Sequence, residues 1–420
     1  MLTLDEKFSV ELDTTQVQSA WSQTPISDRL KIILRLRHLI AENASSLAAA
    51  AAAVSDRPLA EKLVSEVLPL ADACRWLERN AARVLAPQRH GRSGRPFWLQ
   101  GVTLEIQRQP FGNVLVIGPG NYPLFLPAIH TIQALVAGNA VQLKPAPGTR
   151  HVVQAFARLA VSAGLDPALL TILPEHVEAA RRAIDSGVDK VVFTGSSENG
   201  RDVLAHLAET NTPSVMELSG EDPVLVLADA DLDLVVRSLT FGTRLNNGET
   251  CIAPRRLIVV ESVADILLTR MKKLPISIER VPDVEAAIAL INQAEFALGA
   301  SIFSADIGLA QIAAARIQNG VVIINDLIAP TADPRLPFGG ARASGFGSTR
   351  GAEGLLEMTR PHSVIIPHGR SRPHLDAPTK EDAALFINYI RVTHGSRSFA
   401  AVRQLIQAII KVASERKKKS

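Results

Sequence analysis

The stretch Val114-Leu115-Val116-Ile117-Gly118-Pro119-Gly120-Asn121-Tyr122-Pro123 decides the fold class of this chain of 420 residues. Its four apolar residues predict a buried strand, and the glycines and prolines that follow predict a tight turn. Outward from it, apolar runs alternate with helical patterns as far as about residue 230, which predicts an α/β fold with a doubly wound parallel sheet. The other predicted strands are Ala140–Leu143, Leu169–Leu173, Lys190–Phe193 and Val224–Leu227, and the predicted helices lie around 125–137, 150–163, 175–186 and 198–209.

Polar residues follow the ends of several of these strands, where a doubly wound sheet binds its ligands. Asn121 lies in the turn after the first strand, and Lys144 follows the second. Gly195-Ser196 leads from a strand into a helix, whose free N–H groups and dipole favour an anion. Glu217 ends the short apolar run Val215-Met216, where a carboxylate is costly unless it is paired or does chemistry. Taken alone, Asn121 is better explained as an ordinary turn residue, whereas Lys144 fits a solvated lysine and a ligand-binding residue equally well.

Cys251 stands in a break between a helix and a strand. Apolar spacing over 232–245 predicts the helix, Leu257–Val260 predicts the strand, and Asn247-Gly248 interrupts the pattern. A thiol in such a connection lies close to backbone N–H groups, which can stabilise a thiolate and later an oxyanion. A lone cysteine is more often a small buried hydrophobe, so its position alone leaves both interpretations open.

Composition excludes several classes of protein. A hydrophobic content of 47% suffices for two or three domains, and a net charge of +3 is too small to indicate a nucleic-acid partner. Two cysteines cannot form a disulfide framework, so a cytoplasmic location is expected. Cys74 lies on the apolar stripe of a helix predicted from about Pro58 to Leu85, with a kink at Pro69, and is expected in the core. Neither a metal site nor a secretion signal nor a membrane span is expected.

Several motifs occur in an order that is typical of one family. They are the turn at Asn121, Lys144-Pro145, Phe193-Thr194-Gly195-Ser196, Glu217 in Glu-Leu-x-Gly, and Cys251. Further matches are Arg57-Pro58, Ser65-Glu66-Val67-Leu68-Pro69 and Leu336-Pro337-Phe338-Gly339-Gly340. In this order the motifs resemble the aldehyde dehydrogenase superfamily, in particular its shorter class-3-like members, over about residues 10 to 367.

The resemblance implies NAD(P)-dependent oxidation of a small-molecule aldehyde to a carboxylic acid. Cys251 would attack the carbonyl as a thiolate, and Asn121 with the Cys251 N–H would stabilise the oxyanion. Hydride would pass to NAD or NADP, and Glu217 would activate the water that cleaves the thioester. The residues implied in cofactor binding are Ile117, Pro119, Lys144, Gly195, Ser196, Gly200, Leu218 and Phe338.

The resemblance also implies a domain organisation and a homodimer. The expected parts are an NAD(P)-binding domain with N-terminal helices over 1–225, which includes a bridging strand near 101–108, a shortened α/β catalytic domain over 226–335, a return to the cofactor domain over 336–358, and a bridging and oligomerisation strand over 359–370. Residues 371–420 go beyond the resemblance, and their sequence pattern predicts a helical extension with helices around 380–392 and 398–415.

The largest departure from the family follows the strand at 257–260. The family has several dozen more residues there, which end in a Glu-x-Phe-Gly-Pro motif whose glutamate holds the nicotinamide ribose. Here only Val263–Pro275 remains, and Met271-Lys272-Lys273 stands about where that motif would be.

Single positions also depart from the family pattern, among them Ser219 and Glu221, which follow Glu217 where the family has Glu-Leu-Gly-Gly-Lys. Pro147 replaces a glutamate that binds the ribose hydroxyls and repels a 2′-phosphate, which leaves the choice between NAD and NADP open. Glu249 replaces a glutamine two residues before the thiol, and a carboxylate there would raise the pKa of Cys251.

Three functions therefore stay open. The leading one is the aldehyde dehydrogenase. The second is a CoA-acylating or acyl-reducing relative, against which Glu217 argues, and the third is a non-catalytic assembly subunit, for which the missing segment argues. For the basic end of the C-terminal helix, Arg416–Lys419, packing on its own domain is favoured over contact with a membrane.

Overall fold

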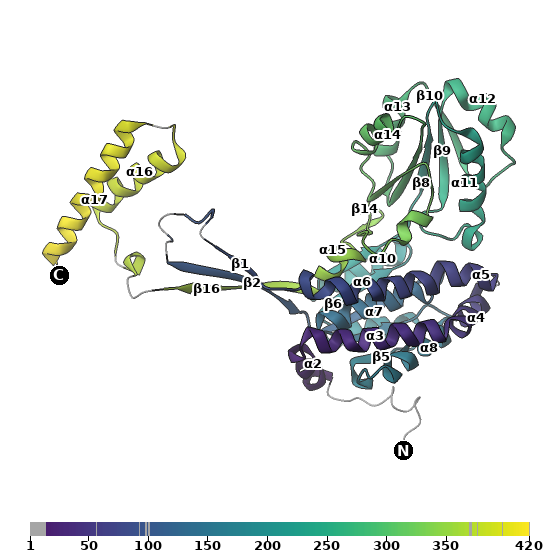
Figure 1. The fold of residues 1–420 in the computed structure, drawn as a ribbon, viewed down its shortest axis with the longest axis horizontal. Coiled ribbons are helices and arrows are strands. Elements are labelled where there is room, and N and C mark those ends of the chain that lie inside the picture. The colour runs from purple at the N-terminus through teal and green to yellow at the C-terminus, as the bar shows by residue number, and fades with distance from the viewer. Residues whose placement is uncertain are drawn as a thin grey trace, which may run out of the picture. The chain divides into compact units, whose positions relative to one another are not determined.

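The computed structural model describes residues 14–419, apart from 56, 92, 97, 98, 100, 369–371, 376 and 397. The chain divides into two compact units, one made of Met1–Arg89 and Glu105–Val364 and the other of His90–Leu104 and Ile365–Ser420. Both of the larger sheets lie in the first unit (Figure 1). The finer domain boundaries expected from the sequence remain a proposal.

Helices form the N-terminal part of the first unit. The helix predicted from about Pro58 to Leu85 is present from Leu59 to Val84, and a π-helical turn, η1 (Leu63–Val67), interrupts it two residues before Pro69. Proline lacks an N–H and its ring crowds the carbonyl four residues earlier, so a wider turn relieves the clash. These elements are α2 (Thr14–Gln23), α3 (Ile26–Glu42), α4 (Ala44–Ser55), α5 (Leu59–Lys62), η1 (Leu63–Val67) and α6 (Leu68–Val84).

The following segment builds a six-stranded sheet with the strand order β15-β7-β6-β3-β4-β5. Five strands are parallel, and the short β15 joins β7 in the antiparallel direction. The predicted alternation of strands and helices is confirmed here. The elements are β3 (Asn113–Ile117), α7 (Phe125–Ala137), β4 (Ala140–Lys144), α8 (Arg150–Ser162), η3 (Pro167–Leu169), β5 (Leu170–Ile172), α9 (Val177–Asp185), β6 (Lys190–Thr194), α10 (Ser197–Ala208), β7 (Ser214–Glu217) and β15 (Gly345–Phe346).

Helices cover both faces of this sheet, because successive strand residues point to opposite faces. Val114 and Val116 of β3 pack in one cluster with side chains of α3, α6, α7 and α8. Leu115 and Ile117 of the same strand pack in another cluster with side chains of α9 and α10. The sheet is therefore doubly wound, as predicted.

A second parallel sheet has five strands in the order β10-β9-β8-β12-β13. The prediction that Val224–Leu227 joins the first sheet is wrong, because β8 pairs with β9 and β12. Helices α11 and α12 cover one face of this sheet, and α13 and α14 cover the other (Figure 1). The elements are β8 (Asp222–Val226), α11 (Leu232–Arg244), η4 (Leu245–Gly248), β9 (Pro254–Val260), α12 (Glu261–Arg270), β10 (Ser277–Val281), α13 (Val284–Asn292), β12 (Gly299–Phe303), α14 (Ile307–Ala314) and β13 (Val321–Ile324).

The remaining strands form two small sheets, β11-β14 and β1-β2-β16, and the chain ends in helices. The two predicted C-terminal helices are present as α16 and α17, which pack against each other. Among the described helices, none has the length and apolar character needed to span a membrane. The remaining elements are β1 (Gln88–His90), β2 (Val102–Pro110), β11 (Phe296–Ala297), η5 (Ala329–Ala332), β14 (Ala341–Arg342), α15 (Gly351–Leu356), β16 (Thr359–Pro367), η6 (Pro373–Leu375), α16 (Lys380–His394) and α17 (Phe399–Lys419).

Candidate active site

The strand ends of the six-stranded sheet lie in register, which brings several predicted site residues together. Ile117 at the end of β3 pairs with Lys144 on β4 and with Phe193 on β6. One residue further along β6, Thr194 pairs with Glu217 at the end of β7. These positions share one edge of the sheet, the edge at which doubly wound sheets bind ligands.

Two turns, one before α7 and one before the candidate nucleophile, are joined by three hydrogen bonds. Asn121 Nδ2 donates to the Glu249 carbonyl at 2.7 Å, and Asn246 Nδ2 donates to the Asn121 carbonyl at 2.9 Å. The hydroxyls of Tyr122 and Thr250 share a buried hydrogen bond of 2.6 Å. The side-chain amide of Asn121 is therefore held beside the backbone that carries the cysteine.

The turn before Cys251 contains three consecutive residues in the left-handed conformation. Asn246, Asn247 and Gly248 have φ values of 48°, 55° and 72°. Glycine adopts this conformation readily and asparagine tolerates it better than most other residues, which explains the sequence Asn-Asn-Gly. The turn ends the helical run abruptly and lets the chain present Cys251 before β9 begins.

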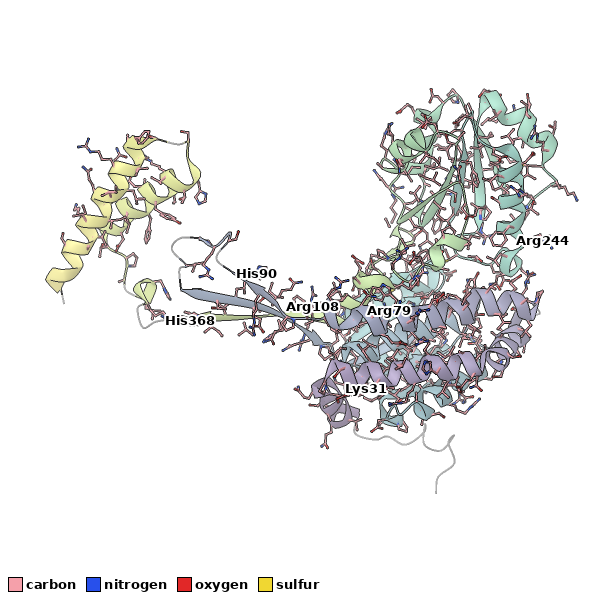
Figure 2. The ribbon with its side chains drawn as sticks, in the orientation of Figure 1. Lys31, Arg79, His90, Arg108, Arg244 and His368 are labelled. Atoms are coloured by element: carbon pink, nitrogen blue, oxygen red, sulfur yellow. The ribbon has the colours of Figure 1, made fainter. Side chains whose placement is uncertain are left out.

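Arg57, in the connection between α4 and α5, and Glu61 of α5 hold this turn. Arg57 Nη1 donates to Asn247 Oδ1 at 2.7 Å. Its Nη2 donates at 3.0 Å to the carbonyl of Arg244, the last residue of α11 (labelled in Figure 2). Glu61 accepts a hydrogen bond of 2.9 Å from the N–H of Asn246. Side chains distant in the sequence thus fix a backbone conformation that is uncommon for asparagine.

Glu66, which lies in the π-helical segment η1, holds the turn before α7. Its Oε2 accepts hydrogen bonds from the N–H groups of Leu124 and Phe125 at 2.7 and 3.2 Å, so a buried carboxylate caps the start of α7. Lys62 Nζ lies 3.1 Å from Glu66 Oε1 and donates to Asn246 Oδ1 at 3.2 Å. One buried ion pair therefore contacts both turns.

Glu217 is buried at the end of β7, and its two oxygens have different surroundings. Thr194 Oγ1 donates to Oε2 at 3.2 Å, and His130 Nε2 lies 3.6 Å from the same oxygen. Oε1 has no hydrogen-bond partner among the described residues. Oε1 is therefore the oxygen that can accept a proton from a substrate or a water molecule.

Cys251 is half-buried between charged groups. Burial raises the pKa of its thiol, the carboxylates of Glu217 and Asp222 raise it further, and Arg350 acts in the opposite direction. The sequence indicated Glu249 as the carboxylate near the thiol. The Glu249 side chain is exposed, and the carboxylates that raise the thiol pKa are Glu217 and Asp222.

Phe338 packs into the hydrophobic cluster of the second sheet, against which Cys251 also packs. Two backbone hydrogen bonds of 2.8 and 2.7 Å join Phe338 to Thr349. The next residue, Arg350, is buried, with its guanidinium carbon 4.4 Å from the centre of the Phe338 ring. Its Nη1 donates to the Thr331 carbonyl at 2.5 Å. The Phe338 ring thus packs against the buried guanidinium of Arg350, which lowers the pKa of Cys251.

The expected cofactor-binding residues suit an anionic ligand. Ser196 is the N-cap of α10, where its Oγ accepts a hydrogen bond from Asn199 N–H at 3.2 Å. A Cβ on Gly200 would lie 2.5 Å from Leu218 Cδ2, so glycine permits the close packing of α10 on Leu218, the residue that follows β7.

Lys144 is 6% exposed, burial lowers its pKa, and its ammonium group makes no hydrogen bond or ion pair within the described residues. The charge of Glu175 opposes this lowering. A buried cation at the same sheet edge as the strand that leads into α10 suits a phosphate or a ribose.

The other expected cofactor contacts lie at the same edge. Ile117 ends β3 and is buried, and Pro119 is half-buried in the turn that follows. The Gly195 N–H donates to the Glu217 carbonyl at 3.1 Å. A Cβ on Gly195 would lie 2.6 Å from the Phe193 ring, so only glycine fits without a shift of that ring.

Sequence reasoning missed His130, Asp222 and Arg350. All residues of α7 are buried, and His130 stands in an otherwise uncharged, largely apolar stretch. A histidine in such a stretch is a sequence signal that could have pointed to an unusual site. Asp222 begins a wholly buried strand, its Oδ1 accepts a hydrogen bond from the Gly299 N–H, and burial raises its pKa well above the usual range. No sequence pattern marked the burial of Arg350.

The second cysteine, Cys74, is fully buried in α6, which confirms its predicted core position. Burial raises the pKa of this thiol to about 12. The described part of the chain holds no group of three or more His, Cys, Asp or Glu residues that could bind a metal ion.

Comparison with known proteins identifies the family. The model of the aldehyde dehydrogenase family matches residues 13–274 and 275–364, and the chain belongs to this family. The 4,4'-diapolycopene aldehyde oxidase of a Methylomonas species is 28% identical, over 83% of this chain and 79% of that protein. A putative succinate-semialdehyde dehydrogenase (NADP+) of Mycolicibacterium smegmatis is 26% identical, over 83% and 82%. A putative aldehyde dehydrogenase structure from Burkholderia cenocepacia shares the fold, with a TM-score of 0.79 at 24% identity over 88% of this chain and 91% of that one.

The family match breaks between Leu274 and Pro275, inside the region from which a segment was predicted to be missing. In the structure Met271 follows the last residue of α12, and only residues 272–276 connect it to β10. No Glu-x-Phe-Gly-Pro sequence occurs in this connection. The glutamate that the resemblance assigns to the nicotinamide ribose thus has no counterpart between β9 and β10.

Proposed function

We propose that the protein oxidises an aldehyde to a carboxylic acid, with NAD or NADP as the hydride acceptor. The observation that carries this proposal is the set of three hydrogen bonds that hold Asn121 beside the turn of Cys251. Membership of the aldehyde dehydrogenase family supports aldehyde oxidation in general. The finer assignment of roles rests on the contacts of the individual side chains.

Three side chains have complementary roles in this proposal. Cys251 attacks the aldehyde carbonyl, and the oxyanion that forms is stabilised by Asn121 Nδ2 and the Cys251 backbone N–H. The bound nicotinamide supplies the acceptor for the hydride that leaves the substrate carbon. Glu217 then takes a proton on Oε1 from the water that cleaves the thioester, because this oxygen has no described hydrogen-bond partner.

The choice of cofactor follows from charge. Lys144 and the start of α10 at Ser196 would hold the ribose and the pyrophosphate. Pro147, exposed after β4, carries no charge that could repel a 2′-phosphate. We therefore include NADP with NAD as a cofactor, and the relative from M. smegmatis is named as NADP-dependent.

We also propose that the protein is cytoplasmic and forms a homodimer. Analytical ultracentrifugation of the full chain tests the dimer.

A panel of aldehydes assayed with both cofactors tests the function. Wild-type protein is expected to form reduced cofactor with at least one aldehyde, and Cys251→Ala is expected to form none, while Cys74→Ala keeps the activity. Addition of CoA distinguishes an acyl-transferring relative, because acyl-CoA would then replace the free acid. Failure of the wild-type protein to bind either cofactor would favour the non-catalytic assembly role.

Glu217→Gln tests the general base. The amide cannot take a proton from water, so thiohemiacetal formation and hydride transfer should persist while thioester hydrolysis stalls. Stopped-flow absorbance should then show a burst of reduced cofactor followed by turnover slowed by about a hundredfold or more. An unchanged steady-state rate would show that Glu217 is structural or that another group activates water.

A further inference from the structure

His130 is a fully buried histidine in the middle of α7, and neither of its ring nitrogens has a hydrogen-bond partner among the described residues. Burying an imidazole without partners costs free energy, and an apolar side chain would fill the same space without that cost. We therefore expect the imidazole ring to form a hydrogen bond in another state of the protein, such as a complex with substrate.

Glu217 is a carboxylate that lies close to His130. His130 Nε2 lies 3.6 Å from Glu217 Oε2, a few tenths of an ångström beyond a hydrogen bond. Hydrogen bonds in active sites are often long before substrate binds and shorten in the complex. Thr194 Oγ1 already donates to the same oxygen at 3.2 Å. Two side chains from different elements thus converge on Oε2, and none of the described groups donates to Oε1.

We propose that His130 is a positioning residue for the proposed general base. Its Nε2–H donates to Glu217 Oε2 during thioester hydrolysis and, together with Thr194, keeps Oε1 directed at the attacking water. In this step the water oxygen bonds to the thioester carbon, a water proton passes to Oε1, and the C–S bond breaks to release the Cys251 thiolate. The proposal rests on the proposed function, because it requires Glu217 to act on an acyl group carried by Cys251.

The test isolates the hydrolytic step from the cofactor. Cys251 is acetylated with 4-nitrophenyl acetate, which needs neither NAD nor NADP, and mass spectrometry follows the decay of the acetyl-enzyme after the ester is removed. The variants are His130→Leu, His130→Gln and Gln133→Leu, each alone and combined with Glu217→Gln. Gln133→Leu is the matched control, because Gln133 is another buried polar residue of α7 and its Oε1 also has no described partner.

His130→Leu should slow acetyl-enzyme decay by about tenfold or more, as expected when a catalytic group loses its alignment. His130→Gln should recover part of the rate, because its amide still carries an N–H, and Gln133→Leu should stay within about twofold of the wild type. In the Glu217→Gln background His130→Leu should cause no further loss, because residues that act as a unit are not additive.

An unchanged decay in His130→Leu, or an equal loss with and without Glu217, overturns the proposal. Thermal unfolding checks that each variant folds, and His130→Asn, whose amide is too short to reach Oε2, replaces His130→Leu if that variant does not fold. A wild-type protein that hydrolyses its acetyl-enzyme but reduces neither cofactor with any aldehyde contradicts the dehydrogenase function and leaves the test of His130 valid. If Cys251 is not acetylated at all, both proposals fail.

Discussion

At the scale of single residues, the two cysteines differ in access. Cys251 is half-buried and Cys74 is fully buried on α6. Brief treatment of the native protein with iodoacetamide should therefore label Cys251 and spare Cys74, because alkylation requires an accessible thiolate. Peptide mass spectrometry measures both positions at once. Preferential labelling of Cys74 would contradict the assignment of Cys251 as the reactive thiol.

Two variants control for the electrostatics of this labelling. The carboxylate of Glu217 raises the pKa of Cys251, so Glu217→Gln should lower that pKa and speed the labelling at neutral pH. Arg350 lowers the pKa, so Arg350→Met should slow the labelling. Labelling of denatured protein should be equal in all variants, which separates the electrostatic effect from differences in the reagent.

Asp222 makes the stability of the fold depend on pH. Burial raises its pKa well above the usual range. A carboxyl group with a raised pKa in the folded state contributes stability below its unfolded pKa of about 4 and loses it as the pH rises through the folded value. Asp222→Asn carries no charge and keeps an oxygen for the Gly299 N–H. It should therefore gain about 1 to 3 kcal/mol in unfolding free energy at pH 8, with a smaller gain at pH 5.

Denaturant unfolding at several pH values measures this difference. Asp202→Asn, an exposed position on α10, serves as the control and should show no change at either pH. A loss of stability in Asp222→Asn at pH 8 would show that the charged form of Asp222 is stabilised by the fold.

At the scale of elements, the buried pair Lys62–Glu66 links the N-terminal helices to the start of α7. Both side chains are fully buried. Lys62→Met leaves the Glu66 carboxylate without its counter-ion, which should cost about 3 to 5 kcal/mol of unfolding free energy. Arg37→Met breaks a more exposed pair with Glu78, whose atoms lie 2.7 Å apart, and should cost about 1 kcal/mol or less. Equal losses of unfolding free energy in the two variants, measured by urea unfolding, would show that the buried pair matters no more to stability than the more exposed one.

The elements also show what the sequence could predict. Strands such as β3 and β6 were predicted to within one residue, because buried β-branched runs bounded by glycine and proline carry a local signal. The assignment of β8 to the wrong sheet arose because strand pairing depends on contacts between distant segments. Asn121 and Glu217 were predicted because each ends a local pattern. His130 and Arg350 were not, because their significance comes only from packing against other elements.

At the scale of the whole molecule, the short connection between α12 and β10 requires compensation if the protein is an enzyme. The segment that the resemblance assigns to the nicotinamide ribose has no counterpart there, while Lys144 and Ser196 are the residues that we propose for the rest of the cofactor. A displacement of about 1 Å in a reacting group can lower a rate by on the order of a hundredfold. Full-length protein should therefore bind NAD or NADP detectably but weakly, with activity that depends on whatever fills the gap.

We propose that the C-terminal extension of a partner subunit, residues 371–420, supplies the contacts that the short connection lacks. Helices α16 and α17 expose large apolar side chains, including Phe386, Ile390 and Phe399, and such surfaces are typically covered by another part of a protein. A truncation that ends at residue 370 should therefore bind cofactor less tightly and oxidise aldehydes more slowly than the full chain, as measured by cofactor fluorescence titration and steady-state assay. Phe399→Ser in the full chain should cause a smaller loss in the same direction. Equal binding and activity in truncated and full-length protein would contradict compensation by the extension, and no binding in either would support the non-catalytic role instead.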